Sequence, residues 1–147
     1  MTKFTSAGSR RQRSAGRSQR GRLRRRDEVV FTGNVGERLR AELSRGVDAD
    51  GPGSHHAEVA LGAGPVRQRL ESAILALSEL RGPDSSTCPS DAARAVGGET
   101  WRELMDAARD IARELAGSGR VEITQRGDVL DPGAEWRGPI RIRTTRR

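Results

Sequence analysis

The residues best able to do chemistry in this chain are one cysteine, two histidines and a pair of aspartates. Cys88 is the only cysteine among 147 residues, which excludes an intrachain disulfide and any zinc site built from several cysteines. It stands where a helix is predicted to begin, and a helix N-terminus favours the nucleophilic thiolate. No histidine follows it, so the usual general base is missing from that part of the chain. We therefore expect no enzyme activity and treat Cys88 as structural, with a nucleophilic role as the alternative.

The histidines and aspartates predict no site either. His55 and His56 are adjacent in a segment rich in glycine, proline and aspartate, with no further ligand pattern around them. Asp106 and Asp110 lie four residues apart in a predicted helix, where a solvated face accounts for both. We expect no bound metal.

A dinucleotide-binding turn is suggested by Val59–Gly64 and then excluded. The strand-like residues and first two glycines fit, but Arg67 stands where the third glycine is needed and Pro65 interrupts the turn. We expect no cofactor.

The longest amphipathic pattern runs from Thr100 to Leu115 and predicts a helix. Its apolar residues recur at the helical period and form one stripe: Trp101, Leu104, Met105, Ala108, Ile111, Ala112 and Leu115. Thr100 and Glu103 have the spacing of a capping box, which predicts the start of the helix. Gly117 and Gly119 predict its end.

Two shorter helices are predicted before this one. The first covers residues 66–80 and ends at a glycine and a proline. The second begins at Pro89, which suits a first helical turn, and Asp91 complements the helix dipole there. Gly97-Gly98 ends it, and the long helix follows at once. Two helices joined by a tight glycine turn are typical of a helix-turn-helix.

Short strands are predicted after the long helix. Residues 121–125 alternate, residues 126–128 supply a turn, and residues 129–130 return as a hairpin. Alternation over residues 140–143 predicts a third short strand. Three helices and a hairpin in this order predict an α+β, mostly α, winged-helix-like domain over residues 66–143.

Charge is distributed unevenly around this domain. The net charge is +7, yet Met1–Arg26 holds ten basic residues and no acid, Arg137–Arg147 holds five arginines and no acid, and the chain between them is acidic. Residues 1–33 have too few apolar side chains to form a core and are predicted to be a disordered arginine-rich arm. The alternative is that the start codon is assigned too early and that residues 1–26 are not translated, since non-coding DNA of GC-rich genomes also gives arginine-, glycine- and alanine-rich stretches when read as protein.

The remaining segments are assigned from composition. Residues 34–47 predict a short helix, residues 48–65 a flexible linker of glycine, proline, aspartate and alanine, and residues 144–147 a basic tail. No apolar run approaches the ~20 residues that span a bilayer, and no signal peptide is recognisable. We expect a cytoplasmic protein with no membrane contact.

Several linked motifs between Leu70 and Arg143 resemble a known family. They are Cys88-Pro89-Ser90, Ala93-Arg94, Trp101-Arg102-x-Leu104-Met105, Gly119-Arg120-Val121, Ile123-Thr124-Gln125, Asp131-Pro132 and Gly138-Pro139-Ile140-Arg141. Together they resemble a small bacterial winged-helix-like family of unknown function, the domain-of-unknown-function 3253 family. The resemblance implies the fold and brings no established activity or site residues.

Nucleic-acid binding is the function that such a fold favours, because the third helix of a winged helix usually enters the major groove while the wing contacts the backbone. The candidate contacts are Ser90, Arg94, Thr100, Arg102, Arg126, Arg141 and Arg143. On a helical wheel, however, Asp106 and Asp110 lie at the exposed pole of the long helix, and Arg109 and Arg113 are predicted to pair with them at i+3. We therefore expect non-specific electrostatic contacts through the first turn of that helix, the wing and the basic ends. The alternative is a protein–protein interaction module on the same scaffold, and an enzyme or accessory domain using Cys88 is the third option.

Overall fold

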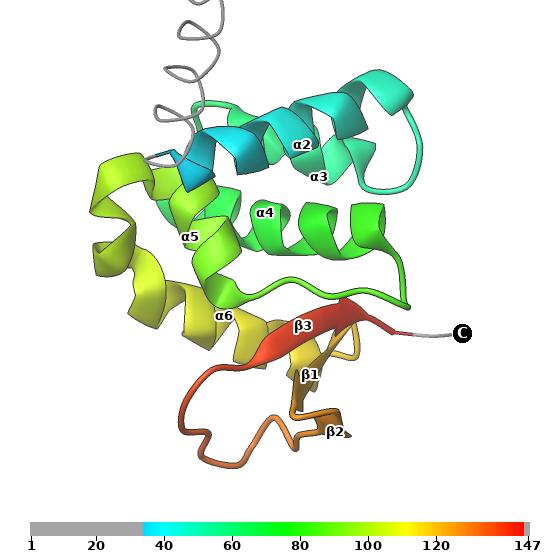
Figure 1. Ribbon diagram of the computed structural model, residues 1–147, viewed down its shortest axis with the longest axis vertical. Coiled ribbons are helices and arrows are strands. Elements are labelled where there is room, and N and C mark those ends of the chain that lie inside the picture. Colours follow the sequence, from blue (N-terminus) through cyan, green and yellow to red (C-terminus); the bar gives the residue numbers. More distant parts are fainter. Residues whose placement is uncertain (1–33, 146–147) are drawn as a thin grey trace, which may run out of the picture. The chain divides into compact units, whose positions relative to one another are not determined.

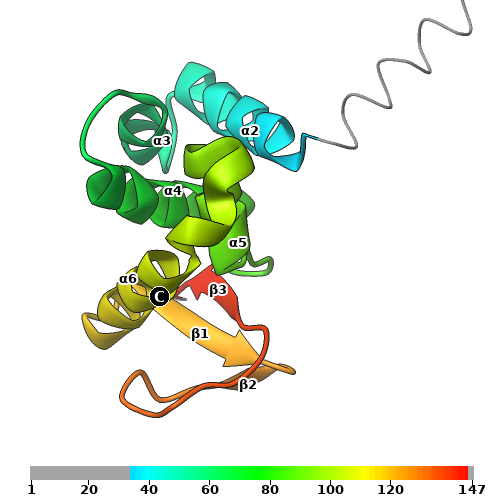
Figure 2. The ribbon, with the colours of Figure 1, turned by 90° about the vertical axis from the view of Figure 1, so that its left-hand side faces the viewer.

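The structure is a computed structural model that describes residues 34–145. The predicted arm, residues 1–33, and the last two residues of the predicted tail lie outside the described residues. Residues from Val35 onward form one compact unit. Its elements, shown in Figures 1 and 2, are α2 (Val35–Ala49), α3 (Ser54–Leu61), α4 (Val66–Arg81), α5 (Pro89–Gly97), the 3-10 helix η1 (Gly98–Leu104), α6 (Met105–Gly117), β1 (Val121–Gln125), β2 (Asp128–Val129) and β3 (Arg141–Thr144).

Helix α4 is the central element of the core. Every residue from Ser72 to Ser78 is buried, as is Leu70. A helix that is buried nearly all round has neighbours on most of its sides. It contacts α2, α3, α5, α6 and β3, so both the helical layer and the sheet depend on it. The prediction of a helix over 66–80 is confirmed within one residue.

The prediction of a flexible linker over residues 48–65 is wrong, because α3 forms within it. Ala57 and Ala60 are buried against the core, and the Arg69 side chain donates to the Ala60 carbonyl over 3.0 Å. α3 packs through these small alanines rather than through large apolar residues, so its buried face gave no recognisable hydrophobic stripe. The short helix predicted at 34–47 is present as α2, with Leu39 and Leu43 buried. The domain predicted to begin at residue 66 therefore begins at Val35.

The start of α5 follows the prediction closely. Pro89 occupies its first turn and Cys88 is the N-cap residue. The Asp91 carboxylate accepts hydrogen bonds from the Thr87 hydroxyl over 2.7 Å and from the Cys88 amide over 3.4 Å. The second bond satisfies a backbone donor at the helix N-terminus, and the first gives a partner to the hydroxyl of Thr87, which is buried.

The long helix predicted from Thr100 begins later, and the predicted capping box is wrong. Residues 98–104 form the 3-10 helix η1, in which Thr100 has φ −97° and ψ 19° and donates its hydroxyl to the Gly97 carbonyl. The preceding glycines allow a tight turn that runs directly into 3-10 geometry, so Thr100 lies inside a helical stretch instead of before it. α6 then starts at Met105 and buries Ala108, Ile111, Ala112 and Leu115. Trp101, predicted as part of this stripe, lies on η1 and is only half-buried.

The sheet is antiparallel with the strand order β2-β1-β3. The turn between β1 and β2 consists of Arg126 at φ 55° and Gly127 at φ 88°, the left-handed pair that two-residue hairpin turns require. β3 pairs with β1 from Val121 to Thr124 and extends to Thr144, so the tail predicted to begin there starts later. On its other side β3 forms a bridge from Ile142 to Thr87, with both hydrogen bonds at 2.7 Å.

The predicted fold class is confirmed: the described residues are mostly helical and carry one small antiparallel sheet near the C-terminus. Within residues 34–145, no helix combines the length and apolarity needed to cross a bilayer.

Candidate nucleic-acid interface

Two of the predicted contact arginines gather around Trp101. The Arg94 guanidinium, from α5, lies over the indole ring at 4.1 Å from its centroid, and the Arg102 guanidinium, from η1, lies at 4.6 Å. Such cation–π contacts keep the guanidinium charge while orienting its plane. Arg102 is exposed, whereas Arg94 is half-buried and its Nε atom is buried without a hydrogen-bond partner. We call Arg94, Trp101 and Arg102 the tryptophan cluster. The sequence placed Trp101 in the core and gave no signal for this arrangement.

Thr100 and Ser90 are less available than predicted. The Thr100 side chain is exposed, but its hydroxyl already donates to the Gly97 carbonyl over 3.0 Å. Ser90 is half-buried, and its hydroxyl lies 3.0 Å from the Cys88 sulfur. Both hydroxyls therefore serve the turns around α5.

The predicted arginines on β3 are engaged with neighbouring elements. Arg141 donates to the hydroxyl and the carbonyl of Ser86, at 2.9 and 3.1 Å, and stays exposed. Arg143 forms an ion pair with Glu122 on β1 at 2.9 Å. Arg126, at the β1–β2 turn, is exposed and makes no hydrogen bond or ion pair with the other described residues. The structure thus brings Arg94 and Arg102 together around Trp101, whereas the Thr100, Ser90, Arg141 and Arg143 side chains are engaged within the fold.

The exposed face of α6 carries the acids predicted for it. Asp106 and Asp110 are both exposed. Their predicted i+3 ion pairs are wrong, because Arg109 donates to the Gly138 carbonyl and Arg113 to the carbonyls of Pro132 and Ala134. Carbonyl groups of the loop between β2 and β3 accept hydrogen bonds from these two arginines. The arginines therefore form no ion pairs with Asp106 and Asp110.

A second group of charges is structural. Arg81 of α4 lies 2.8 Å from Glu42 of α2 and 3.2 Å from Asp91 of α5, so one guanidinium joins three helices. Hydrogen bonding to Glu42 raises the pKa of Arg81, and its partial burial lowers the pKa by less. Burial alone would raise the pKa of Asp91, but the Thr87 hydroxyl, the Arg81 charge and the Cys88 amide together hold that pKa below its ordinary value.

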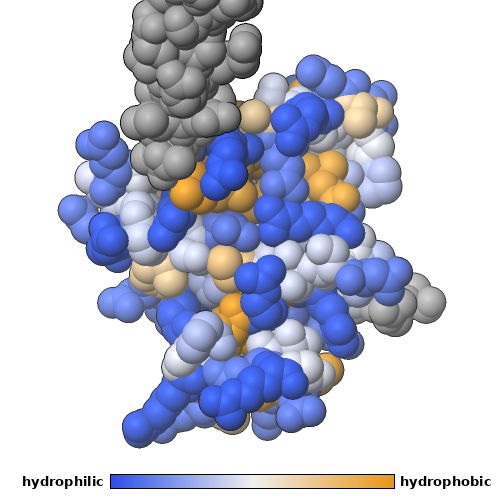
Figure 3. Space-filling view, viewed as in Figure 1, coloured by the Kyte–Doolittle hydropathy of each residue, from blue (hydrophilic) through white to orange (hydrophobic). Residues whose placement is uncertain are grey.

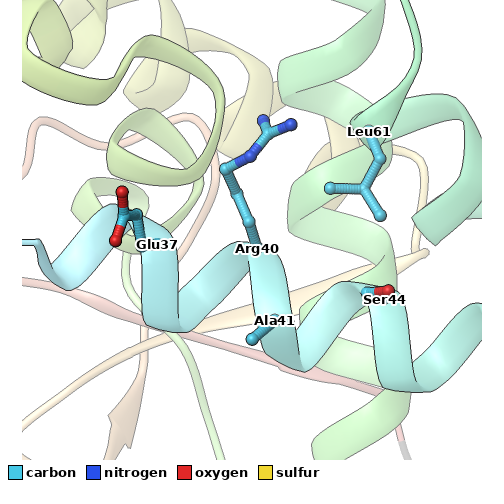
Figure 4. Close-up of a pocket in the computed structure, with 5 residues that line it drawn as sticks. All are labelled: Glu37, Arg40, Ala41, Ser44 and Leu61. Atoms are coloured by element: carbon cyan, nitrogen blue, oxygen red, sulfur yellow. The ribbon is translucent and has the colours of Figure 1, made fainter. Parts of the chain in front are cut away.

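One hollow of about 410 Å³ lies over α2. Figure 4 shows Glu37, Arg40, Ala41 and Ser44 on α2, and Leu61 at the end of α3. Arg40 already donates to the Ala95 carbonyl over 3.1 Å. Neither of the two buried, unpartnered polar atoms of the described residues lines this hollow, so nothing in it specifies a ligand.

Metal chemistry finds no support in the part of the chain that the structure describes. No group of three or more His, Cys, Asp or Glu side chains is placed to hold an ion there. His55 and His56 lie on α3 with their ring centroids 5.8 Å apart and make no such group.

The sequence comparisons agree with the motifs that span the three C-terminal helices and the sheet. A family model matches residues 67–145, more than half of the chain. The chain belongs to the family described as Protein of unknown function (DUF3253). The match confirms the family assignment over Leu70–Arg143 and runs from the second residue of α4 through β3, whereas α2 and α3 precede the DUF3253 segment. No curated protein matches the chain.

Proposed function

We propose that this chain is a non-catalytic, winged-helix-like domain of the cytoplasm that associates with nucleic acid electrostatically. The contacts are Arg102, the exposed arginine of the tryptophan cluster, the β1–β2 turn and the basic ends of the chain. The order of α4, α5, α6 and the sheet, together with the bridge from Thr87 to β3, supports the winged-helix-like assignment.

The tryptophan cluster is the observation that carries the proposal. Arg102 is exposed on η1, directly after the turn that follows α5, and Trp101 orients its guanidinium. An oriented, exposed guanidinium suits phosphate oxygens, to which it can donate two parallel hydrogen bonds. Phosphate contacts supply most of the affinity in sequence-independent binding.

The helices of the domain contribute little beyond this cluster. Residues 34–145 hold fifteen arginines and eighteen acidic residues, so the described part is not basic overall. Asp106 and Asp110 would repel phosphates along the exposed face of α6. Deep insertion of α6 into a groove is therefore not part of the proposal.

A protein–protein interaction module is the second candidate, favoured by the same acidic face of α6. A basic protein segment would be attracted where phosphate is repelled. Against this candidate, the face in Figure 3 shows only small, separate apolar areas among hydrophilic side chains. Among residues 34–145, Val66 and Val129 are the only large apolar residues that are exposed. Protein interfaces usually have a contiguous apolar centre.

The test is the salt dependence of binding to a labelled 20-base-pair DNA duplex, measured by fluorescence anisotropy. We expect the full chain to bind with a steep salt slope that becomes shallower when residues 1–26 and 146–147 are removed; the cut spares β3, which extends to Thr144. Arg102→Gln should reduce the slope by about 0.9. Arg45→Gln is the matched control, because Arg45 is exposed on α2 without a described partner.

Either of two results would overturn the proposal. One is affinity that changes neither on truncation nor in Arg102→Gln. The other is binding of a basic peptide to the α6 face, abolished by Asp106→Asn and Asp110→Asn, with no salt-dependent binding of the duplex; that result would establish the second candidate.

A further inference from the structure

The loop between β2 and β3 is held in one conformation by side chains from α6 and β1. Arg113 donates from Nη1 to the carbonyls of Pro132 and Ala134, and its guanidinium lies 4.1 Å from the centre of the Trp136 ring. The Trp136 indole donates to the Asp131 carbonyl over 3.1 Å. The first half of the loop is thereby closed on itself and attached to α6.

The second half of the loop is attached to the end of β1. The Gln125 side-chain amide donates to the carbonyl of Arg137 over 2.6 Å and to the carbonyl of Pro139 over 3.0 Å. Arg109 adds a longer bond, 3.4 Å, to the Gly138 carbonyl. Figure 2 shows the loop running beside β1 and β2. Loops usually have few such constraints, and a fixed loop positions whatever it exposes.

Gln125 brings two exposed arginines to the same end of the sheet. Arg126 follows it directly in the chain, and the Arg137 main chain is bonded to its side chain. Both arginines are exposed, and neither side chain has a hydrogen bond or ion pair with another described residue. Arg137 was not among the residues predicted to contact a partner, because eleven residues separate it from Gln125 in sequence.

From this juxtaposition we infer that residues 131–139 form a preorganised recognition loop in which Arg137, together with Arg126, binds the phosphodiester backbone. Gln125 is the positioning residue that holds the two arginines at one edge. The inference rests on the proposed function and locates a second contact, separate from the tryptophan cluster.

Neighbouring acids limit the attraction to short range. Asp128 lies opposite Gln125 in the strand register, and Asp131 and Glu135 belong to the loop itself; all three are exposed. The patch is therefore not a broad positive surface. A phosphate has to reach the two guanidinium groups directly, and a fixed loop lowers the entropy cost of that contact.

The duplex assay on the full chain tests this inference. Each lost phosphate contact lowers the salt slope by about 0.9, which corresponds to about eightfold in affinity at 0.1 M salt. We expect this change for Arg137→Gln and for Arg126→Gln. The matched control is Arg120→Gln, which removes the same charge just before β1, about 16 Å from Gln125 at ~3.3 Å per strand residue.

Gln125→Met tests the positioning role, because it removes the amide donors without changing the charge. We expect weaker binding in this variant. In an Arg137→Gln background, however, Gln125→Met should have little further effect on affinity, since the contact that it positions is already gone. A purely structural role for Gln125 would give equal losses in both backgrounds and would overturn the positioning claim.

The outcomes separate this inference from the proposed function. Salt-dependent binding with equal affinities for Arg137→Gln and Arg120→Gln overturns the loop contact and leaves the proposed function standing. Absence of salt-dependent binding by the full chain overturns both.

Discussion

Leu43→Ala tests whether α2 and α3 belong to one cooperative unit with the DUF3253 segment. Leu43 lies on α2, outside the residues that the family model matches, yet it is 1% exposed and belongs to the core. Replacing a leucine at such a site removes buried apolar surface and leaves a cavity, at a cost of about 2–5 kcal/mol. Since a domain of this size has a free energy of unfolding of about 5–15 kcal/mol, the loss is large.

Contacts of α2 with the rest of the unit should transmit the destabilisation caused by Leu43→Ala. α2 contacts α3, α4 and α5, and Arg81 joins Glu42 of α2 to Asp91 of α5. Residue 43 is therefore connected to the family segment by packing and by charge. If the unit unfolds in one step, a probe on the opposite side of the core must report the same destabilisation.

Trp136 supplies that probe, since it lies in the β2–β3 loop against Arg113. In a Trp101→Phe background, urea unfolding is followed by Trp136 fluorescence and by circular dichroism at 222 nm. We expect both midpoints to fall together in Leu43→Ala. Val66→Ala is the control: Val66 is 47% exposed, and its substitution should change stability by no more than about 0.5 kcal/mol. A Trp136 transition that stays at the parent midpoint while the helical signal is lost earlier would refute the reasoning.

Two further predictions concern charge and packing. The pKa of Asp91 is held below its ordinary value in the folded state. Its stabilising contribution is therefore complete above the pKa that Asp91 has in the unfolded chain, and is lost as the pH falls through the folded-state pKa. Between pH 7 and pH 3, the free energy of unfolding measured in urea should decrease less for Asp91→Asn than for the parent or for the exposed control Asp110→Asn. Gly36→Ala would place a Cβ 2.5 Å from the Arg94 carbonyl oxygen, so we expect destabilisation by about 1–3 kcal/mol. Gly51→Ala is the control, because its new Cβ meets nothing within 4 Å. A thermal melt should show a lower midpoint for Gly36→Ala and an unchanged midpoint for Gly51→Ala.

Local patterns predicted most of the DUF3253 segment correctly. Pro89 and Asp91 mark the start of α5 because capping depends on residues within one turn, and Arg126-Gly127 marks the hairpin because only a few residue types tolerate a positive φ. The prediction failed at α3, where the buried face consists of Ala57 and Ala60. Alanine also occurs on exposed surfaces, so only the packing of α2 and α4 against α3 distinguishes a packed helix from a linker.

The candidate site was harder to predict than the fold. Arg94 and Arg102 were named from their places in the motif, but their stacking on Trp101 follows from the 3-10 turn, which removes that indole from the α6 stripe. Arg137 was missed because its association with Arg126 depends on the Gln125 amide and on the path of a loop that no local pattern describes.

The sequence by itself determined the order of α4, α5 and α6, the hairpin, the acidic exposed face of α6 and the absence of a second cysteine, because each depends on residue type and short-range spacing. Only the tertiary structure decided which arginines are available to a partner. On a helical wheel Arg109 and Arg113 are predicted to pair with Asp106 and Asp110, but in the structure they donate to loop carbonyls, and Arg143 is paired with Glu122 across the sheet. Arginine is long and has five donors, so its partner is chosen by whatever the fold brings within reach. Charge can be counted from the sequence, but its availability is a property of the folded chain.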